Sequence, residues 1–554
     1  MPLAHIDVLV TVAPAEAPYW LVARSKRVLP LADGTMPAET LAELRARIPR
    51  LVAVFGNGPA TGSAAAKVHE AGIPLVLFTD DASVAVPPGV EVRPATDAGP
   101  PMAVADSLLD LVGETPLLAL HRTGRGVACH LLAKLEYLNP GGSVKDRPAL
   151  AMVAAAERDG HLLPGGTIVE PTSGNTGVGL AMVAALRGYR CVFTMPDKIA
   201  AEKMQLLRAY GAEVIVCPTA VAPEHPDSYY SVANRVTAST PGAFQPNQYH
   251  TPENPASHYR TTGPEIWRQT AQRVTHLVAS IGTGGTISGV GRYLKDQNPA
   301  VQVIGADPEG SVYSGGGGRP YLVEGIGEDF WPTTYDQSVV DRVVAVSDAN
   351  SFATARRVTR EEGLHVGGSC GTAIWAALEV GRELGPDDVV VVLLPDSGRG
   401  YLSKLYNDAW MADHGFLQAT GPTVGRVLSQ KSGAIPPLVH IHPDETVRSA
   451  IALLREFEVS QMPVVKAEPP LALAEVVGSV SDRALLARAL SDPASLESPV
   501  SAVMDAPLPT IGTGETIDQA AARLQDSPAV LALDQGHPIG ILTRSDLLVY
   551  LARQ

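Results

Sequence analysis

Cysteine is scarce in this chain. Among 554 residues there are four, and no two of them have the spacing of a zinc-ligand pair: Cys129, Cys191, Cys217 and Cys370. A small secreted domain held together by disulfides carries a much denser set of cysteines. The sequence therefore predicts neither a zinc site nor a disulfide framework, and it favours the reducing environment of the cytoplasm.

Basic charge and long apolar runs are also lacking. The 43 Lys and Arg residues are outnumbered by 58 Asp and Glu residues, which gives a formal net charge of -15. Nucleic-acid binding needs a basic surface, so this balance is unfavourable for it. No apolar run reaches the roughly 20 residues of a membrane-spanning helix, and residues 1–12 lack the pattern of a signal peptide. We expect a cytoplasmic protein that acts on small molecules, without nucleic-acid or membrane partners.

The chain is too long for a single hydrophobic core, so roughly two to four domains are expected. A Pro- and Gly-rich stretch at Asp97–Pro101 indicates a linker after the first of them. The predicted segments are a small domain, a long central domain and two short modules, with these boundaries: 1–98, 102–418, 422–490 and 495–554.

The first segment reads as a small α/β domain of unknown role. Short apolar runs indicate strands, and polar and Ala-rich stretches between them indicate helices. Phe55–Gly62 follows a strand and precedes a helix, as in a nucleotide-binding βαβ unit, but Pro59 and the glycine spacing weaken that match. An interaction or scaffold domain is therefore favoured over a ligand site. The predicted strands are Val8–Val12, Trp20–Ala23, Leu51–Phe55 and Leu75–Phe78, and the predicted helices are Ala38–Arg47 and Ser63–Ala71.

The central segment alternates short apolar runs with Ala-rich helical patterns. Examples of the runs are Thr167–Val169, Cys191–Met195 and Val389–Leu394. Strands that alternate with helices predict parallel sheets covered on both faces. The fold class expected for this segment is α/β, with two parallel-sheet subdomains.

One lysine in the central segment follows a glycine-serine turn. Asn139–Arg147 places Lys145 between this turn and an Ala-rich helix. A lysine that does chemistry is usually an amine nucleophile in a partly desolvated pocket, where it forms a Schiff base with a carbonyl compound. Most lysines are solvated surface charges, so the motif needs support from the rest of the chain.

Three further glycine-rich turns supply that support. Glu170–Gly177 and Gly282–Thr286 each follow a strand and open a helix, where backbone N–H groups can bind an anion. The first is also typical of an ordinary capped turn, and the second fits a single phosphate better than a dinucleotide. Gly367–Gly371 places Ser369 on a third turn, and a neutral hydroxyl facing a pyridine nitrogen would favour prompt β-elimination.

These motifs, in this order, resemble the fold type II pyridoxal-phosphate enzymes of the cysteine synthase and cystathionine β-synthase family. The resemblance covers about residues 102–418. It implies that Lys145 is the Schiff-base lysine and catalytic base, that Asn175 binds the 3′-oxygen of the cofactor and that Ser369 faces its ring nitrogen. The implied phosphate site is Gly282, Thr283, Gly284, Gly285 and Thr286. The implied contacts to the substrate carboxylate are Thr172, Ser173, Thr176 and Gln248.

The resemblance also implies a β-replacement reaction. The bacterial, haem-free type is favoured by Glu324–Phe330 and Asp396–Tyr401, which leads us to expect serine and homocysteine as substrates and cystathionine as product. Animal enzymes tend to carry a tyrosine where this chain has Glu328, so the contacts to the acceptor thiol stay open. The alternative enzyme is a cysteine synthase that uses O-acetylserine and sulfide. The alternative outside enzymes is an adenosyl-binding regulatory or scaffold protein.

The tail contains an internal repeat. Thr446 and Thr516 each stand where a helix N-cap belongs, ahead of helices that run to Leu454 and Leu524. Each copy then returns to a strand, a turn and a helix, at residues 477–482 and 539–546. The pattern resembles a tandem pair of the small regulatory modules named after cystathionine β-synthase (CBS modules), which commonly bind adenosyl ligands.

This second resemblance implies a regulatory site. Thr543 and Asp546 match positions that hold an adenosyl ribose, with Gln461 on the wall of the same site. Ala484 stands at the position equivalent to Asp546 in the first copy, so only one of the two clefts is expected to bind. S-adenosylmethionine is the expected allosteric ligand, and a tail that only sets the oligomeric state is the alternative.

No haem is expected, because residues 1–101 contain no cysteine and their histidines are His5 and His69. The family resemblance also implies a homodimer or homotetramer.

Overall fold

The computed structural model divides into two compact units, residues 1–111 and 112–554. It describes residues 105–552 apart from positions 173, 198, 200, 219–220, 222–224, 420, 432–435 and 437. Before residue 105 it describes 8–11, 28–30, 52–55, 59–70, 75–78, 84, 86, 88 and 90–93.

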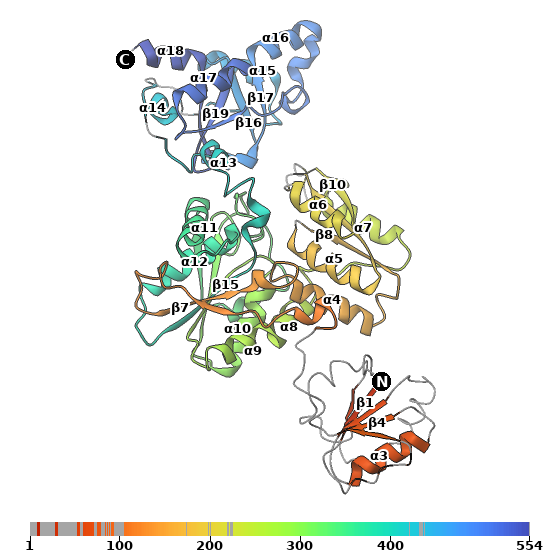
Figure 1. Ribbon diagram of the computed structural model, residues 1–554. Coiled ribbons are helices and arrows are strands. Elements are labelled where there is room, and N and C mark those ends of the chain that lie inside the picture. Colours follow the sequence, from red (N-terminus) through yellow and green to blue (C-terminus); the bar gives the residue numbers. More distant parts are fainter. Residues whose placement is uncertain are drawn as a thin grey trace. The chain divides into compact units, whose positions relative to one another are not determined.

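Unit 1 is a parallel five-stranded sheet with the strand order β2-β1-β3-β4-β5 (Figure 1). The strands are β1 (Val8–Thr11), β2 (Val28–Pro30), β3 (Val52–Phe55), β4 (Leu75–Phe78) and β5 (Glu91–Arg93). Three of them fall on predicted strands, and α3 (Pro59–Glu70) overlaps the helix expected at Ser63–Ala71. β2 and β5 were not predicted. The strand expected at Trp20–Ala23 and the helix expected at Ala38–Arg47 lie outside the described residues.

The larger sheet of unit 2 has six strands in the order β14-β13-β12-β15-β7-β6. Five are mutually parallel, and β6 pairs antiparallel with β7 at the edge. Their bounds are β14 (Arg342–Val346), β13 (Gln302–Pro308), β12 (His276–Ser280), β15 (Val389–Leu394), β7 (His130–Leu135) and β6 (Leu117–Ala119). The expectation of a parallel sheet is confirmed for all but this edge strand.

Helices cover both faces of the six-stranded sheet. Side chains of β15 alternate between the two faces, as a strand requires. Val390, Val392 and Leu394 belong to a core shared with α11 and α12. Val391 and Leu393 belong to a second core shared with α9 and α10. These helices are α9 (Thr262–Gln269), α10 (Gly285–Gln297), α11 (Asp348–Glu362) and α12 (Gly368–Gly381).

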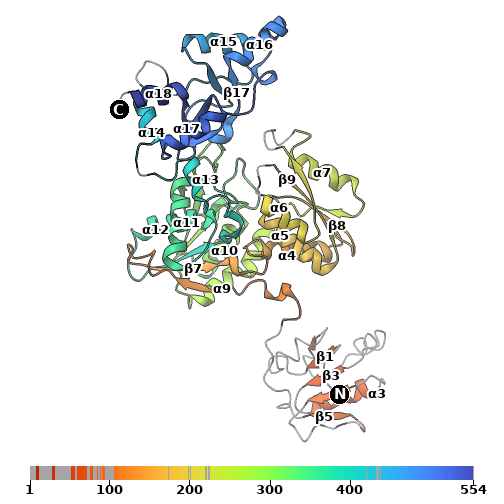
Figure 2. The same cartoon turned by 45° about the horizontal axis from the view of Figure 1, so that its top comes forward.

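A second, four-stranded parallel sheet has the order β10-β9-β8-β11 (Figure 2). Its strands are β8 (Thr167–Pro171), β9 (Arg190–Pro196), β10 (Glu213–Cys217) and β11 (Ala243–Phe244). The accompanying helices are α4 (Asp146–Arg158), α5 (Asn175–Arg187), α6 (Ala201–Ala209), α7 (Tyr229–Ser239) and α8 (Glu253–Arg260). The six-stranded and four-stranded sheets form the two parallel-sheet subdomains expected from the sequence.

The tail folds as two related copies. The first contains α15 (Val447–Glu456), β16 (Gln461–Val465), β17 (Val476–Ser481) and α16 (Asp482–Ser491). The second contains β18 (Thr510–Gly512), α17 (Ile517–Asp526), β19 (Ala529–Asp534), β20 (His537–Thr543) and α18 (Arg544–Ala552). Both predicted N-caps are confirmed, because Thr446 and Thr516 each accept a hydrogen bond from the backbone N–H three residues on.

One helix packs outside its own copy. α14 (Val424–Ser429) precedes the first copy along the chain, but its Val424 and Val427 lie in the core of the second. The domain boundaries given above stay predictions. Within unit 2, Arg319 of the central segment also donates two hydrogen bonds to Glu475 of the first copy, at 3.1 and 2.7 Å. No helix in the described ranges is long and apolar enough to cross a membrane.

The start of α4 is anchored by a buried network of charges. The Arg147 guanidinium donates to both oxygens of Glu136, at 2.7 and 2.8 Å, and to both oxygens of Glu265, at 2.6 and 2.7 Å. Lys134 is fully buried and also donates to Glu265, at 2.7 Å. Bidentate pairing of this kind suits the planar guanidinium better than the ammonium of lysine. The network therefore fixes the backbone two residues after Lys145.

We expect Arg147→Ala to destabilise unit 2 strongly. The substitution leaves Glu136 without its guanidinium, and removing one partner of a buried ion pair costs about 3–5 kcal/mol. Urea unfolding followed by near-ultraviolet circular dichroism measures the shift. Arg158→Ala, in the last turn of the same helix, is the matched control: its ion pair with Asp159 is exposed and should contribute less than about 1 kcal/mol. Equal midpoints for the two variants would contradict the anchoring role.

Candidate active site

The N-termini of three helices of unit 2 contribute lining residues to one cavity. The cavity has an empty volume of about 470 Å³, and Lys145, Asn175, Ser369, Asp396 and residues 282–284 are among its lining residues. The helices α5, α10 and α12 begin at Asn175, Gly285 and Gly368, and none has an acidic residue in its first turn. Helix N-termini carry partial positive charge and free N–H groups. The cavity is therefore suited to a ligand with anionic groups.

Lys145 stands at the wall of this cavity, immediately before α4. Burial lowers the pKa of its ammonium to about 8, although Glu328 and Asp396 act in the opposite direction. A lysine with this pKa has a useful fraction of unprotonated amine near neutral pH, which is what a nucleophile or a general base requires. The turn before it is held by the hydrogen bond from the Val144 N–H to the Pro395 carbonyl, at 2.8 Å.

Asp396 connects the separate segments of the site. Its Oδ2 accepts from the Asn175 amide at 2.8 Å and from the Tyr401 hydroxyl at 2.6 Å. Its backbone carbonyl accepts from the Gly367 N–H at 3.2 Å and from the Cys370 thiol at 3.3 Å. Burial raises the pKa of Asp396, and the Tyr401 and Asn175 donors to its carboxylate act in the opposite direction. The sequence predictions missed this role, although an acid directly after the apolar strand β15 was a signal for it.

The glycine loop before α10 is packed closely on its neighbours. Gly284 has φ +81°, and a Cβ there would lie 2.4 Å from Tyr335; a Cβ on Gly285 would lie 2.1 Å from the Asn254 amide oxygen. Only glycine fits such positions. Asn254 also donates to the Thr283 hydroxyl at 3.0 Å. The loop is thereby held rigidly with its N–H groups at the cavity.

A buried histidine supports the other end of this loop. The His258 Nε2 lies 3.2 Å from the Thr286 hydroxyl, and its Nδ1 lies 2.9 Å from the Thr262 hydroxyl. Burial lowers the pKa of His258 well below its usual value, and the charges of Arg147 and Lys145 add to this effect. The ring is therefore neutral and acts as a hydrogen-bonding support. Neither His258 nor Asn254 had a sequence signal of its own.

The residues predicted to bind the substrate carboxylate lie close together where the structure describes them. Thr176 is buried and donates to the Gln248 side-chain oxygen at 2.6 Å. The Gln248 N–H donates to Glu170 at 3.0 Å. Thr172 accepts from the Gly174 N–H at 3.3 Å. Ser173 lies outside the described residues.

The pKa values of two glutamates in the segment 324–328 are shifted in opposite directions. Glu324 accepts from both Lys203 and Lys404, and although burial would raise its pKa, these two cations lower it. Burial raises the pKa of Glu328 to about 8, and Asp329 adds to the shift while Lys145 opposes it. Glu328 thus carries a carboxyl group whose charge interacts with that of Lys145 and that a bound cation would ionise.

The predicted regulatory residues lie in two modules. Gln461 is buried at the start of β16 in the first copy, whereas Thr543 and Asp546 stand at the start of α18 in the second. Asp546 accepts from the Thr543 N–H and hydroxyl, both at 2.7 Å, and pairs with Lys431 at 2.8 Å. The adenosyl role of these residues stays a prediction.

The donor set of the cavity matches the groups of pyridoxal phosphate. The cofactor has an aldehyde, a phenolic oxygen, a ring nitrogen and a phosphate. The cavity offers a desolvated amine at Lys145, an amide at Asn175, a buried neutral hydroxyl at Ser369 and the helix start at Gly282–Thr286. The roles of the individual residues stay predictions, but their types fit the group.

Comparison with known proteins gives the family. The model of the family described as pyridoxal-phosphate dependent enzyme matches residues 108–396, more than half of the chain. The chain belongs to the pyridoxal-phosphate dependent enzymes. The CBS domain model matches the tail of this enzyme twice, at residues 433–491 and 500–553. Both resemblances expected from the sequence are thereby confirmed.

Two curated relatives of this pyridoxal-phosphate dependent enzyme carry the same name. This chain is 43% identical to a cystathionine beta-synthase of Oryctolagus cuniculus over 379 residues, which cover 65% of this chain and 68% of that one. It is 35% identical to a cystathionine beta-synthase of Dictyostelium discoideum over 468 residues, which cover 81% and 93%. The chain thus spans about two thirds of the mammalian relative and nearly all of the amoebal one.

Solved structures match the central part of the enzyme. An O-acetylserine dependent cystathionine beta-synthase from Helicobacter pylori is 37% identical, with a TM-score of 0.52, and the match covers 55% of this chain and 99% of that one. A hydrogen sulfide-producing enzyme from Fusobacterium nucleatum is 34% identical, with the same coverage and TM-score.

We expect Lys145→Ala to abolish the visible absorbance of the bound cofactor. The variant lacks the amine that would hold the cofactor covalently, so added pyridoxal phosphate should keep the spectrum of the free compound. Lys295→Ala is the control, because Lys295 pairs with Asp341 outside the cavity; its spectrum should match that of the unaltered enzyme. A bound-cofactor band in Lys145→Ala would rule out this lysine.

Proposed function

We propose that this enzyme condenses L-serine with L-homocysteine to cystathionine and water, under regulation by an adenosyl ligand at its CBS modules. The observation that carries the proposal is the single cavity lined by Lys145, Asn175, Ser369 and the Gly282–Thr286 loop. The shared name of the curated relatives supports the choice of reaction. In the reaction a Cβ–O bond breaks, a Cβ–S bond forms, and the thiol proton leaves with the hydroxyl as water.

Lys145 is the proposed proton carrier. Pyridoxal phosphate, when bound, withdraws electrons from the Cα of an amino acid and so weakens the Cα–H bond. The Lys145 Nζ takes the Cα proton and returns it before the product leaves. Its pKa of about 8 is close to the working pH, where a group can both accept and donate a proton efficiently.

The other cavity residues orient the reactants. We propose that Asn175 binds the 3′-oxygen of the cofactor, since its amide is already held by Asp396. Ser369 would face the ring nitrogen, and Gly282–Thr286 would bind the phosphate through backbone N–H groups. Thr172, Ser173, Thr176 and Gln248 would hold the carboxylate of the amino acid.

Glu328 is the residue that we propose selects the acceptor. Homocysteine carries an ammonium group and sulfide does not. A partly buried carboxyl group with a pKa of about 8 ionises when an ammonium binds beside it. Glu328 would therefore favour homocysteine over sulfide, because it supplies the matching charge.

A second reaction is supported by the structural relatives. The Helicobacter pylori protein is titled O-acetylserine dependent and the Fusobacterium nucleatum protein is titled hydrogen sulfide-producing. Cysteine synthesis from O-acetylserine and sulfide uses the same cavity groups. Steady-state rates with each donor and each acceptor separate the reactions. If sulfide alone were consumed, the cystathionine proposal would fail.

We expect Glu328→Gln to raise KM for homocysteine roughly 10-fold or more, because it removes a charged partner worth about 1.5–3 kcal/mol. KM for sulfide should stay within about 2-fold, since sulfide brings no ammonium group to the site. Initial rates against each acceptor at fixed donor concentration measure both values.

Asp329→Asn provides the control for this experiment. It keeps the Glu328 carboxyl group and removes an exposed neighbouring acid whose charge adds to the raised pKa of Glu328, so KM for homocysteine should not rise. A parallel rise of both KM values in Glu328→Gln would mean that this residue has no part in choosing the acceptor.

The adenosyl site remains a proposal that rests on the second CBS copy. Asp546 would accept both ribose hydroxyls, next to Thr543. In the structure the same carboxylate accepts two hydrogen bonds from Thr543 at the start of α18, as in a helix cap. Loss of binding in a variant must therefore be separated from loss of this cap.

We expect Asp546→Ala to abolish calorimetric binding of S-adenosylmethionine. Thr516→Ala is the matched control, because it removes the capping interaction of α17 in the same copy without touching the proposed site. The control should bind normally. Unchanged binding by Asp546→Ala would remove this residue from the site, and loss in both variants would assign the effect to the fold of the copy.

We further propose that the enzyme works in the cytoplasm as a homodimer or homotetramer. The four unpaired, buried cysteines support a reducing location. We propose small amino acids as its partners.

A further inference from the structure

Two histidines in the first CBS copy face the same side of an extended segment. Between them, Ile441 forms a parallel bridge with Val464, and its side chain is fully buried. Its N–H donates to the Pro463 carbonyl at 3.2 Å and its carbonyl accepts from the Val465 N–H at 2.9 Å. Because side chains alternate along an extended chain, His440 and His442 both point away from that core.

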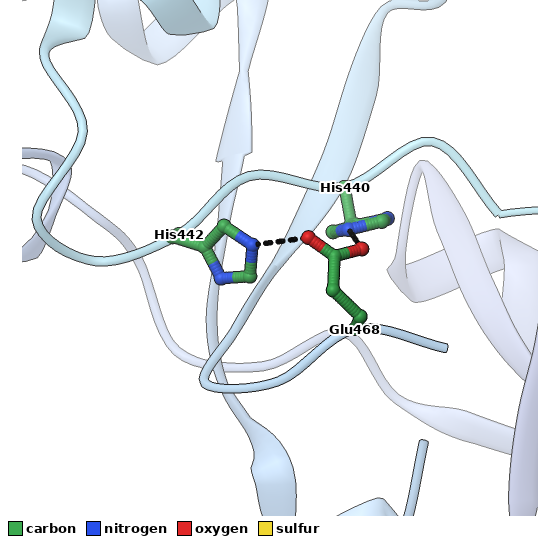
Figure 3. A group of neighbouring side chains, drawn as sticks. All are labelled: His440, His442 and Glu468. Carbon is green, nitrogen blue, oxygen red and sulfur yellow. Dashed lines mark hydrogen bonds and ion pairs between the residues drawn. The ribbon is translucent and has the colours of Figure 1, made fainter. Parts of the chain in front are cut away.

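A glutamate from the loop after β16 completes the group (Figure 3). Glu468 reaches the His440 Nε2 with one oxygen, at 3.3 Å, and the His442 Nε2 with the other, at 3.1 Å. One ligand atom from each of the three residues lies within 4.8 Å of the others. In the described part of the chain this is the one such group of histidine, cysteine and acidic residues.

The other nitrogen of each ring is fixed by a backbone carbonyl. The His440 Nδ1 lies 3.2 Å from the Leu438 oxygen, and the His442 Nδ1 lies 2.9 Å from the Val465 oxygen. A carbonyl can only accept, so both Nδ1 atoms carry hydrogen. In the neutral rings, both Nε2 atoms then present lone pairs towards a carboxylate. Protonation of the rings, or a cation bound between the three groups, makes this arrangement favourable.

Metal-binding histidines are oriented in this way. A histidine that binds a metal usually donates its other N–H to a carbonyl or a carboxylate, which fixes the tautomer and the ring. In a tetrahedral zinc site with bonds of about 2.0–2.1 Å, neighbouring ligand atoms are roughly 3.3 Å apart. Each histidine lies close to that spacing from one oxygen of Glu468, at 3.3 Å for His440 and 3.1 Å for His442. Glu468 is 75% exposed, so water can fill the remaining position.

We propose that His440, His442 and Glu468 form a binding site for a divalent transition metal, with Zn²⁺ as the preferred ion. Two imidazoles and one carboxylate suit zinc, cobalt, nickel and copper, and they suit magnesium or calcium poorly. The site joins the segment before α15 to the loop after β16, so the metal would cross-link two parts of the first CBS copy.

Equilibrium dialysis of the full chain against ZnCl2 tests the site. The holoenzyme is prepared without a polyhistidine tag and is first treated with a chelator. We expect one zinc ion per chain, and at least 10-fold weaker binding in His442→Gln and in Glu468→Gln. The matched control is His225→Asn, because His225 faces a single carboxylate, that of Asp227, at 3.9 Å. The control should bind zinc as the unaltered chain does.

Cobalt provides a second, spectroscopic measurement of metal binding at this site. Co²⁺ bound with low coordination number gives visible d–d absorption, which should be present in the unaltered chain and in His225→Asn and absent from the two site variants. Unchanged far-ultraviolet circular dichroism and cofactor absorbance in the variants would show that they fold. Equal zinc binding by the unaltered chain and His442→Gln, or no binding by either, would overturn the proposal and leave a histidine–carboxylate ion-pair cluster.

Discussion

The buried pairing of Arg147 with Glu136 and Glu265 is the constraint on which the catalytic unit depends. Burial alone would raise the pKa of Glu265, but Arg147 and Lys134 lower it to about 2, so the carboxylate stays charged inside the protein. Such a network costs desolvation energy and is stable only with every member in place. The network holds the first turn of α4 in one position, and with it the adjacent backbone of Lys145.

A second constraint is centred on Asp396. Asp396 follows the strand β15 and receives donors from Asn175, Tyr401 and Cys370. These three donors come from separate parts of the chain but share Asp396 as their acceptor. The glycine loop before α10 is supported independently, by Asn254 and His258 of α8. Each part of the cavity thus has its own rigid support, as preorganised sites require.

Residues whose roles depend on nearby positions in the chain were predictable from the sequence. Lys145, Asn175, Ser369 and the loop Gly282–Thr286 all stand at strand ends or helix starts, and the parallel topology brings such positions to one edge of a sheet. The helix caps Thr446 and Thr516 were likewise predictable, because capping depends on residues a few positions apart.

The supporting residues were not predictable, because their partners are distant in sequence. Asn175 meets Asp396 across 221 positions, and Arg147 meets Glu265 across 118. No pattern in a single sequence reports such pairs. The antiparallel edge strand β6, three residues long, was missed for a related reason: its direction follows from pairing with β7 and not from its own composition.

The proposed reaction gives a reason for the burial of the four cysteines. An enzyme that draws a free thiol into its cavity risks trapping that thiol as a mixed disulfide whenever an oxidant is present. Cys370 is next to Ser369 in the chain, yet burial raises its pKa well above the usual value, and its thiol donates to the Asp396 carbonyl. Burial raises the pKa of the other three thiols as well. Thiol–disulfide exchange requires a thiolate, so these four cysteines would not react with the sulfur compounds that the enzyme handles.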